Sequence, residues 1–350
     1  MAKPKVLIVG AGGVGTICAL GLTLNDLSDV TLVVRSDYDY VKEHGYTINS
    51  VTYGNIEHWR PNHISRTVTE AFKSQGEFDY IVLTTKNIPD GPITCEEIIE
   101  PAVTDKTTII LVQNGYGIEV PMIKRFPKNL ILSGVSLIGS SNIKCVIENL
   151  HKDQIYIGLF KNQNVDPEIG KSRIKDFIEI YQSKDDKNKV MIDDDVEKRR
   201  WEKLIYNAVF NTTTSLVNLD INRCQMNNAN DTVFRPAMKE IVAIAASEGV
   251  EIASLTLELF LHIGDGLFYS PSMCVDMRKN QLLELEVILG NPLRVAERNG
   301  VPTPCLSLLY SLLKMVQFRI KEERGLIKID KSKFTGNSDE FPRILAETNK

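Results

Sequence analysis

The side chains with the clearest chemical potential lie in an apolar stretch near residue 200. Lys203, Asn207 and Asn211 recur every four residues. On a helix, each step of four residues rotates the position by only about 40°, so these side chains form one polar stripe. Polar groups on a buried helix need partners, and a cleft that holds a polar substrate would supply them. The alternative is a stripe that simply faces bulk water.

A second set of polar residues follows about seventy positions later. Its members are Ser272, Asp276, Asn280 and Glu284, again four apart, on a segment that Pro271 would open as a helix. Such a stripe taken alone is more often a solvated face. Two such stripes in one helical region that follows a nucleotide site in the sequence favour a cleft lined by both stripes more than either stripe does alone.

A glycine motif near the N-terminus predicts a dinucleotide site. Gly10, Gly12 and Gly15 fit G-x-G-x-x-G, with Gly13 and Val14 between the last two. The motif follows an apolar run and opens a helical pattern, which is the context that makes it specific. Gly10 would permit a tight turn, Gly12 a close approach of the pyrophosphate, and Gly15 close packing of helix and strand. The alternative is a plain glycine turn between core elements.

The end of the second expected strand favours NADP over NAD. An acidic residue at this place usually binds the ribose hydroxyls of NAD, whereas a cation suits the 2′-phosphate of NADP. Here Arg35 and Ser36 occupy it, twenty residues beyond Gly15. A guanidinium can bind phosphate through two hydrogen bonds. The alternative is an ordinary surface arginine.

Two further polar loops follow expected strands. Lys86 ends the sequence Thr-Thr-Lys, and Asn114 lies between Gln113 and Gly115. Ligands of open α/β sheets bind beyond the carboxyl ends of the strands, so both loops lie at the correct edge for cofactor or substrate. Turn chemistry alone would also explain the Asn-Gly pair.

The elements that must position these residues fall into two regions. The first alternates apolar strands with helical patterns, as expected for a Rossmann-type, doubly wound α/β sheet. Smaller strands are expected between residues 130 and 160. The expected helices are Gly13–Leu24 and Ile169–Gln182, and the other expected strands are Lys5–Val9, Val30–Val34, Tyr80–Thr84, Thr108–Val112 and Val190–Ile192.

Beyond residue 194 the apolar spacing becomes helical, which predicts a second, all-helical domain. Its clearest segments are Ile244–Leu261, Ser272–Asn299 and Pro304–Lys321. The sequence therefore predicts a Rossmann domain over 1–194, a helical substrate domain over 195–330 and a polar tail over 331–350.

Composition limits the class of protein. The 350 residues are 43% hydrophobic and 25% charged, with a net charge of −4, which argues against a general nucleic-acid binder. The six cysteines are far apart and form no metal-ligand spacing, so no metal site is expected. The N-terminal apolar run is too short for a signal-peptide core, and no stretch is long enough to span a membrane, so we expect a cytoplasmic protein with no membrane partner. The leucine-rich C-terminal helices would form either a homodimer contact or a core.

These motifs together resemble the ketopantoate reductase (2-dehydropantoate 2-reductase) family, especially its fungal members. The resemblance covers nearly the whole chain, because the motifs keep the family's order and spacing. It rests on the glycine motif, Thr-Thr-Lys at Lys86, Gln-Asn-Gly at Asn114, W-x-K-x3-N-x3-N from Trp201 to Asn211, S-M-x2-D-x7-E from Ser272 to Glu284, Gly-Asn-Pro at 290–292 and the proline-rich turn at 300–304.

The resemblance implies hydride transfer from NADPH to the ketone of a 2-oxo acid, most simply 2-dehydropantoate, which yields pantoate for pantothenate biosynthesis. By this resemblance Lys203 would be the general acid and Glu284 would hold both the lysine and the new hydroxyl. The residues expected to orient substrate are Asn114, Asn207, Asn211 and Ser272, with Asp276 supporting the second stripe; Lys86 is expected near the nicotinamide.

Three departures from the family's pattern concern the substrate. Leu283 replaces a usual threonine, Glu286 replaces a frequent aspartate, and Tyr269 stands where some members have an asparagine. They leave hydride transfer intact but bring a related, bulkier or less polar ketone into consideration. Two different functions would also suit these motifs: another NADP-linked dehydrogenase activity on this scaffold, and a non-catalytic NADPH-binding sensor.

Overall fold

The computed structural model describes residues 2–349, which form two compact units. The first runs to Pro89 and resumes over Ile93–Leu204; the second comprises Asp90–Pro92 and the chain from Ile205 onward. The boundary falls inside helix α7 (Val196–Tyr206), later than the change in composition at residue 194. Among the helices of residues 2–349, none is both long and apolar enough to cross a membrane.

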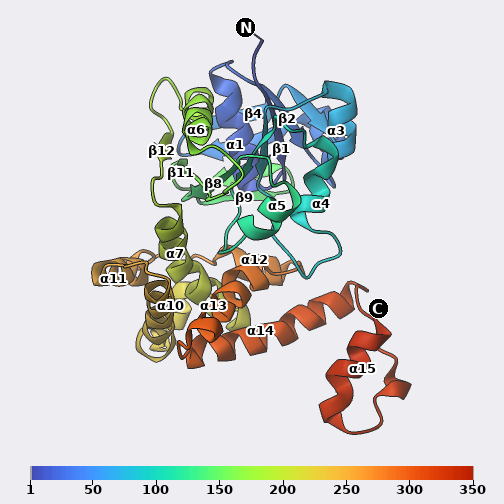
Figure 1. Ribbon diagram of the computed structural model, residues 1–350, viewed down its shortest axis with the longest axis vertical. Coiled ribbons are helices and arrows are strands. Elements are labelled where there is room, and N and C mark those ends of the chain that lie inside the picture. Colours follow the sequence, from blue (N-terminus) through green and yellow to red (C-terminus); the bar gives the residue numbers. More distant parts are fainter. Residues whose placement is uncertain (1, 350) are drawn as a thin grey trace. The chain divides into compact units, whose positions relative to one another are not determined.

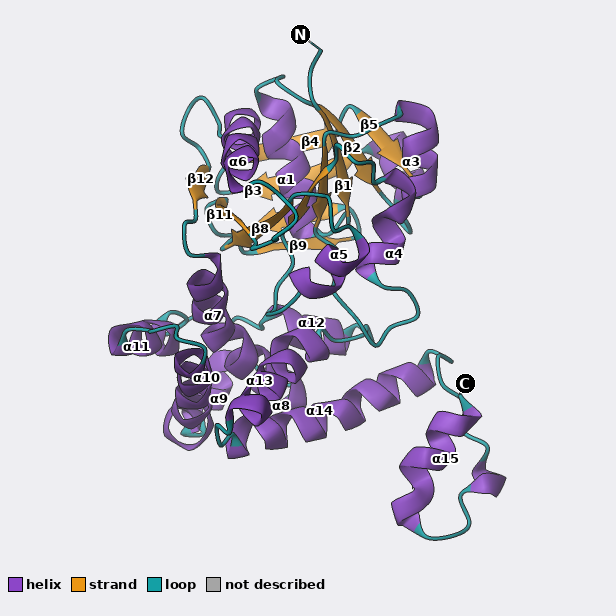
Figure 2. Ribbon diagram, viewed as in Figure 1, coloured by secondary structure: helices purple, strands orange, loops and turns teal. Residues whose placement is uncertain are grey.

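The first unit is built on an eight-stranded sheet of the order β12-β11-β8-β7-β6-β1-β2-β5 (Figures 1 and 2). Strands β5, β2, β1, β6, β7 and β8 are mutually parallel, whereas β11 runs antiparallel to β8. This confirms the Rossmann-type α/β prediction. The strands are β1 Lys5–Val9, β2 Asp29–Val33, β5 His63–Ser65, β6 Tyr80–Leu83, β7 Thr108–Leu111, β8 Ile131–Ser136, β11 Gln154–Leu159 and β12 Lys189–Ile192.

Helices cover both faces of this sheet, so its central strands are apolar on both sides (Figure 2). Every residue of β6 and β7 is buried. Thr94 and Glu97 form a reciprocal capping box at the start of α4, which fixes where that helix begins. The helices are α1 Gly13–Leu24, α2 Tyr38–His44, α3 Val68–Gln75, α4 Cys95–Ile99, α5 Glu119–Arg125 and α6 Pro167–Tyr181, with a 3-10 turn at Glu100–Ala102.

A smaller sheet of the order β4-β3-β10-β9 packs beside α1. Strands β9 (Ser140–Ile143) and β10 (Val146–Asn149) lie in the region where short strands were expected. Strands β3 (Tyr46–Ser50) and β4 (Gly54–Trp59) were not predicted. β10 pairs with β3 across about one hundred residues of sequence, a long-range contact that local patterns do not reveal.

The second unit is helical as predicted. Helix α14 (Pro304–Glu323) confirms the expected segment Pro304–Lys321, whereas two other expected segments are interrupted. The expected helix Ile244–Leu261 is divided between α10 and α11 by an irregular turn. The unit also contains π-helical turns. The elements are α8 Thr212–Val217, α9 Ile221–Met226, α10 Arg235–Ser247, α11 Ser254–His262, α12 Ser272–Arg278, α13 Asn291–Asn299, α14 Pro304–Glu323 and α15 Phe341–Thr348, with π-helices η2 Asn207–Asn211, η3 Asn230–Phe234 and η4 Glu286–Gly290.

The prediction of one helix over Ser272–Asn299 is wrong. Helix α12 ends at Arg278, Asn280 has the left-handed φ of 52°, and residues 281–284 are not helical. Glu284 directly precedes the next helical stretch, and its carbonyl accepts the amide of Ile288 at 3.1 Å. The four residues of the second stripe therefore do not share one helical face.

The residues after 330 contain two 3-10 turns, Lys331–Lys333 and Ser338–Glu340, and helix α15. Asn349 closes this segment because its side chain pairs with both the amide and the carbonyl of Lys328, at 2.7 and 3.1 Å. The rings of Phe334 and Phe341 meet edge to face beneath it.

Candidate active site

The parallel strands bring four predicted loops of the first unit to one edge of the sheet. The glycine motif follows β1, Arg35 follows β2, Lys86 follows β6 and Asn114 follows β7. Since β2, β1, β6 and β7 are adjacent and parallel, all four loops lie beyond their carboxyl ends. This is the edge at which open α/β sheets bind nucleotides.

Close packing explains two glycines of the motif. A Cβ on Gly15 would lie 1.9 Å from the carbonyl oxygen of Gly10, and a Cβ on Gly10 would meet Thr84 at 2.8 Å. Gly10 also has a φ of 120°, which side chains rarely adopt. The Thr84 hydroxyl donates to the Gly10 carbonyl at 2.8 Å, and this bond fixes the turn against β6.

Gly12 differs because nothing in the protein requires a glycine there. A Cβ at this position would have no heavy atom within 4 Å, and its φ of −74° and ψ of −178° suit any residue. The space in front of Gly12, at the start of helix α1, therefore fits a pyrophosphate. Asn142 in β9 holds the loop from behind, since its amide donates to the Ala11 carbonyl at 2.8 Å.

Arg35 lies exposed just beyond β2. Among residues 2–349, no carboxylate lies within ion-pair distance of its guanidinium. The adjacent Ser36 donates to the Asp37 carboxylate at 3.0 Å. The Arg35 guanidinium is thus exposed beyond the end of β2, whereas the Ser36 hydroxyl already has an acceptor.

Gln113 ties the two strand-end loops together. Its buried carboxamide donates to the Thr85 carbonyl at 2.9 Å and to the Cys95 thiol at 3.1 Å. Lys86 follows Thr85 directly and is exposed, while Asn114 follows Gln113 and is half-buried. Both loops lie at the predicted edge of the sheet, and the Gln113 hydrogen bonds hold them next to each other there.

Arg200 anchors helix α7 to the Asn114 loop, and the sequence analysis missed it. Its buried guanidinium donates to the carbonyls of Leu111, Gln113 and Gly115, each at 3.1 Å, and to the Ser133 hydroxyl at 2.9 Å. Burial lowers the pKa of Arg200 to about 10, so it remains charged at neutral pH. Its neighbours Lys198 and Arg199 are also basic, so neither its type nor its position distinguished Arg200 in the sequence.

Lys203 lies one turn further along α7, still within the first unit. Its ammonium donates to the carbonyl of Ser136, at the end of β8, at 2.6 Å. Because Arg200 bonds the same helix to the Asn114 loop, the backbone of Lys203 is held in place relative to that of Asn114. The first unit thus contains the proposed acid together with every proposed cofactor residue.

In the second unit, Asn207 and Asn211 are both buried, which rules out the alternative of a stripe facing bulk water. They lie on the π-helix η2, not on a regular α-helix as expected. The side-chain nitrogen Nδ2 of Asn211 donates to the side-chain oxygen Oδ1 of Asn207 at 3.3 Å, so the two carboxamides remain neighbours. Short π-helical turns occur often at functional sites.

The second stripe is divided, yet two of its acidic residues are buried. Asp276 and Glu284 are 7% and 5% exposed, so the solvated-face interpretation is wrong for both, whereas Asn280 lies exposed in a turn. Ser272 is half-buried at the start of α12, with no side-chain cap from Ser270. Helix α12 and π-helix η4 each pack against η2, which brings these segments beside Asn207 and Asn211.

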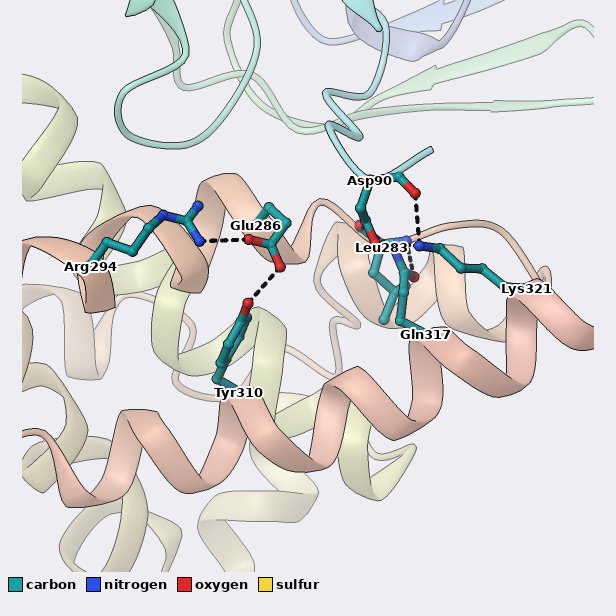
Figure 3. Close-up of polar contacts among 7 residues, drawn as sticks. All are labelled: Asp90, Leu283, Glu286, Arg294, Tyr310, Gln317 and Lys321. Atoms are coloured by element: carbon teal, nitrogen blue, oxygen red, sulfur yellow. Dashed lines mark hydrogen bonds and ion pairs between the residues drawn. The ribbon is translucent and has the colours of Figure 1, made fainter. Parts of the chain in front are cut away.

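Two of the residues that depart from the family's pattern, Glu286 and Leu283, form hydrogen bonds within the helical unit (Figure 3). The carboxylate of Glu286 accepts the Tyr310 hydroxyl at 2.6 Å and pairs with Arg294 at 3.0 Å. Leu283 is fully buried and bonds through its backbone to Gln317. Tyr269 is 40% exposed, and its carbonyl accepts the amide of Ile221.

Comparison with known proteins decides the family. The profile described as "Ketopantoate reductase PanE/ApbA" matches residues 6–162, and its C-terminal counterpart matches residues 195–317. The chain belongs to the ketopantoate reductase family. It is therefore an oxidoreductase of a family that acts on CH–OH groups and uses nicotinamide cofactors.

Relatives within the ketopantoate reductase family cover nearly the whole chain. An uncharacterized protein of Saccharomyces cerevisiae is 46% identical, over 95% of this chain and 98% of its own length. A 2-dehydropantoate 2-reductase of a Nostoc species is 24% identical, over 94% and 100%. The crystal structure of 2-dehydropantoate 2-reductase from Methylococcus capsulatus superposes with a TM-score of 0.75 at 27% identity, covering 90% of this chain and 97% of that one.

Proposed function

We propose that this protein reduces a 2-oxo acid to the 2-hydroxy acid with NADPH, most simply 2-dehydropantoate to pantoate. The observation that carries the proposal is the buried polar set of Asn207, Asn211, Asp276 and Glu284 in a member of this family. Carboxamides and carboxylates gathered on neighbouring helical segments are the kind of polar groups that orient a small polar ligand.

The chain's own residues divide the work as follows. The Lys203 ammonium donates a proton to the ketone oxygen and stabilises the negative charge that develops on it. The Glu284 carboxylate holds that ammonium and the new hydroxyl. Asn114, Asn207, Asn211 and Ser272 orient the acid, and Asp276 supports them. By the resemblance, Lys86 would contact the nicotinamide end of the cofactor. These roles follow the family resemblance, residue by residue.

NADPH, when bound, supplies the hydride. The glycine motif would hold its pyrophosphate over Gly12 and the start of α1, and Arg35 would hold its 2′-phosphate. The open space at Gly12 and the exposed guanidinium of Arg35 support this assignment.

The protein is further predicted to be cytoplasmic and to form a homodimer.

Oxidation of NADPH against a panel of ketones tests the function. The panel includes 2-dehydropantoate, bulkier and aromatic 2-oxo acids, and each ketone with an amine, with NADPH and NADH in parallel. We expect turnover with 2-oxo acids and a higher kcat/KM with NADPH. Preference for another ketone would favour the different substrate that Leu283 and Tyr269 suggest, while saturable NADPH binding without turnover would favour a sensor.

The cofactor assignment predicts a loss of NADPH affinity in Arg35→Asp. Replacing the guanidinium removes a charge-assisted contact worth about 1.5–3 kcal/mol, so the KM for NADPH should rise roughly 10- to 100-fold. The KM for NADH, which lacks the 2′-phosphate, should not rise and is the control, because an acidic residue at this place suits the ribose hydroxyls of NAD. An unchanged KM for NADPH would remove Arg35 from the cofactor site.

A further inference from the structure

A second polar cluster of the helical unit surrounds Glu284 without belonging to the proposed substrate set. Gln317 on α14 is 3% exposed, and its carboxamide oxygen accepts the Leu283 amide at 2.9 Å. The nitrogen of the same carboxamide donates to the Leu283 carbonyl at 3.2 Å (Figure 3). The side chain therefore binds both polar groups of the residue directly before Glu284.

This pair of hydrogen bonds supplies partners for two buried backbone groups. Residues 281–284 lie outside any helix or strand, and Leu283 is fully buried, so its amide and carbonyl have no regular partners. A buried backbone amide or carbonyl without a hydrogen-bond partner lowers the free energy of unfolding. A carboxamide is one of the few side chains that both donates and accepts, which lets one glutamine satisfy both groups.

Helix α14 also holds the residues that follow Glu284. Tyr310 lies seven positions before Gln317, which places it two turns away on the same helical face. Its hydroxyl donates to Glu286, whose other oxygen pairs with Arg294 (Figure 3). Burial and the Glu286 carboxylate raise the pKa of Tyr310 to about 12, so its hydroxyl stays a donor at neutral pH. The two anchors flank Glu284.

Gln317 makes a third contact, with the strap Asp90–Pro92. Its nitrogen reaches the Asp90 carboxylate at 3.4 Å, and Lys321, one turn further along α14, pairs with the same carboxylate at 2.6 Å. The strap comes from the loop that begins with Lys86 and belongs to the second unit. One amide thus lies between the Glu284 segment and this strap.

We propose that Gln317 is a positioning residue for Glu284: its carboxamide fixes the Leu283 backbone and, together with Tyr310, sets the direction of the Glu284 side chain. This inference rests on the proposed function for the role of Glu284. Gln317 binds the backbone of Leu283, and its effect on catalysis passes through the Glu284 carboxylate.

The test replaces Gln317 with methionine, which nearly keeps the shape and removes the hydrogen bonds. We expect kcat to fall about 10- to 100-fold, because small misplacements of a catalytic group cost this much. The Kd for NADPH should stay unchanged. The matched control is Gln225→Met, which removes a carboxamide bonded to Leu261 and Asp265 in the same unit and should leave kcat unchanged.

A double-mutant cycle distinguishes a residue that positions Glu284 from one that only stabilises the fold. In the background of Glu284→Ala, adding Gln317→Met should lower kcat no further, because the group that it positions is gone. An equal loss in both backgrounds would overturn the proposal.

Hydrogen exchange followed by mass spectrometry measures whether Gln317 holds the Leu283 backbone, and it needs no enzymatic turnover. Peptides spanning residues 280–287 should take up deuterium faster in Gln317→Met than in the unmodified protein, while peptides of the first unit stay the same. Unchanged exchange there would overturn the anchor itself. If no ketone were turned over, the proposed function would fail, and the exchange result would still decide whether Gln317 holds Leu283.

Discussion

Replacing Lys203 with alanine should lower kcat for ketone reduction by about 10²- to 10⁴-fold, the usual contribution of one acid–base group. The methyl group cannot donate the proton that the ketone oxygen needs as hydride arrives, nor stabilise the charge on that oxygen. Steady-state rates with NADPH and a saturating 2-oxo acid measure the loss.

The control for Lys203→Ala is cofactor binding. The ammonium's contact in the first unit is with the Ser136 carbonyl, away from the glycine motif and Arg35 in sequence. The Kd for NADPH should therefore stay near that of the unmodified protein, and the variant should remain folded. A variant that keeps its full kcat would exclude Lys203 as the general acid.

Replacing Gly12 with valine should abolish most NADPH binding without unfolding the protein. The added side chain would enter open space in the free protein, and the backbone angles at Gly12 suit a β-branched residue. The same atoms would occupy the place of the pyrophosphate. We expect the Kd for NADPH, measured by titration calorimetry, to rise at least about 100-fold, or roughly 2.7 kcal/mol.

Two glycine variants make this result specific. Gly336→Val places the same side chain in open space in the C-terminal segment and should leave NADPH binding unchanged. Gly15→Ala should instead lower the melting temperature, because its Cβ would meet the Gly10 carbonyl. A Gly12→Val protein that binds NADPH with the original Kd would place the pyrophosphate elsewhere.

The Rossmann half was largely predictable because its central strands are buried on both faces. Strands such as β6 and β7 appear in the sequence as short, continuous apolar runs, each followed by a polar loop. Their parallel arrangement then places the loops of Lys86 and Asn114 at one edge. Strand β4 was missed because it is largely exposed and lacks an apolar run, and it is held by pairing with β3.

The helical half was predictable in kind but not in detail. The apolar periodicity through Ser272–Asn299 continues across a break that only distant residues explain. Gln317 supplies the partners for Leu283, some thirty residues away, and no local pattern reveals that. The spacing of four also suggested a regular helix at Asn207 and Asn211, where the chain forms a π-helix.

Transfer of a labelled hydride tests the reductase account most directly. NADPH carrying deuterium at both C4 hydrogens of the nicotinamide is incubated with the protein and 2-dehydropantoate, and the product is analysed by mass spectrometry. The account predicts pantoate with a single deuterium at C2, formed in step with NADPH oxidation and lost in Lys203→Ala. Unlabelled product, or bound NADPH that stays unoxidised with 2-dehydropantoate and with every other 2-oxo acid supplied, would contradict it.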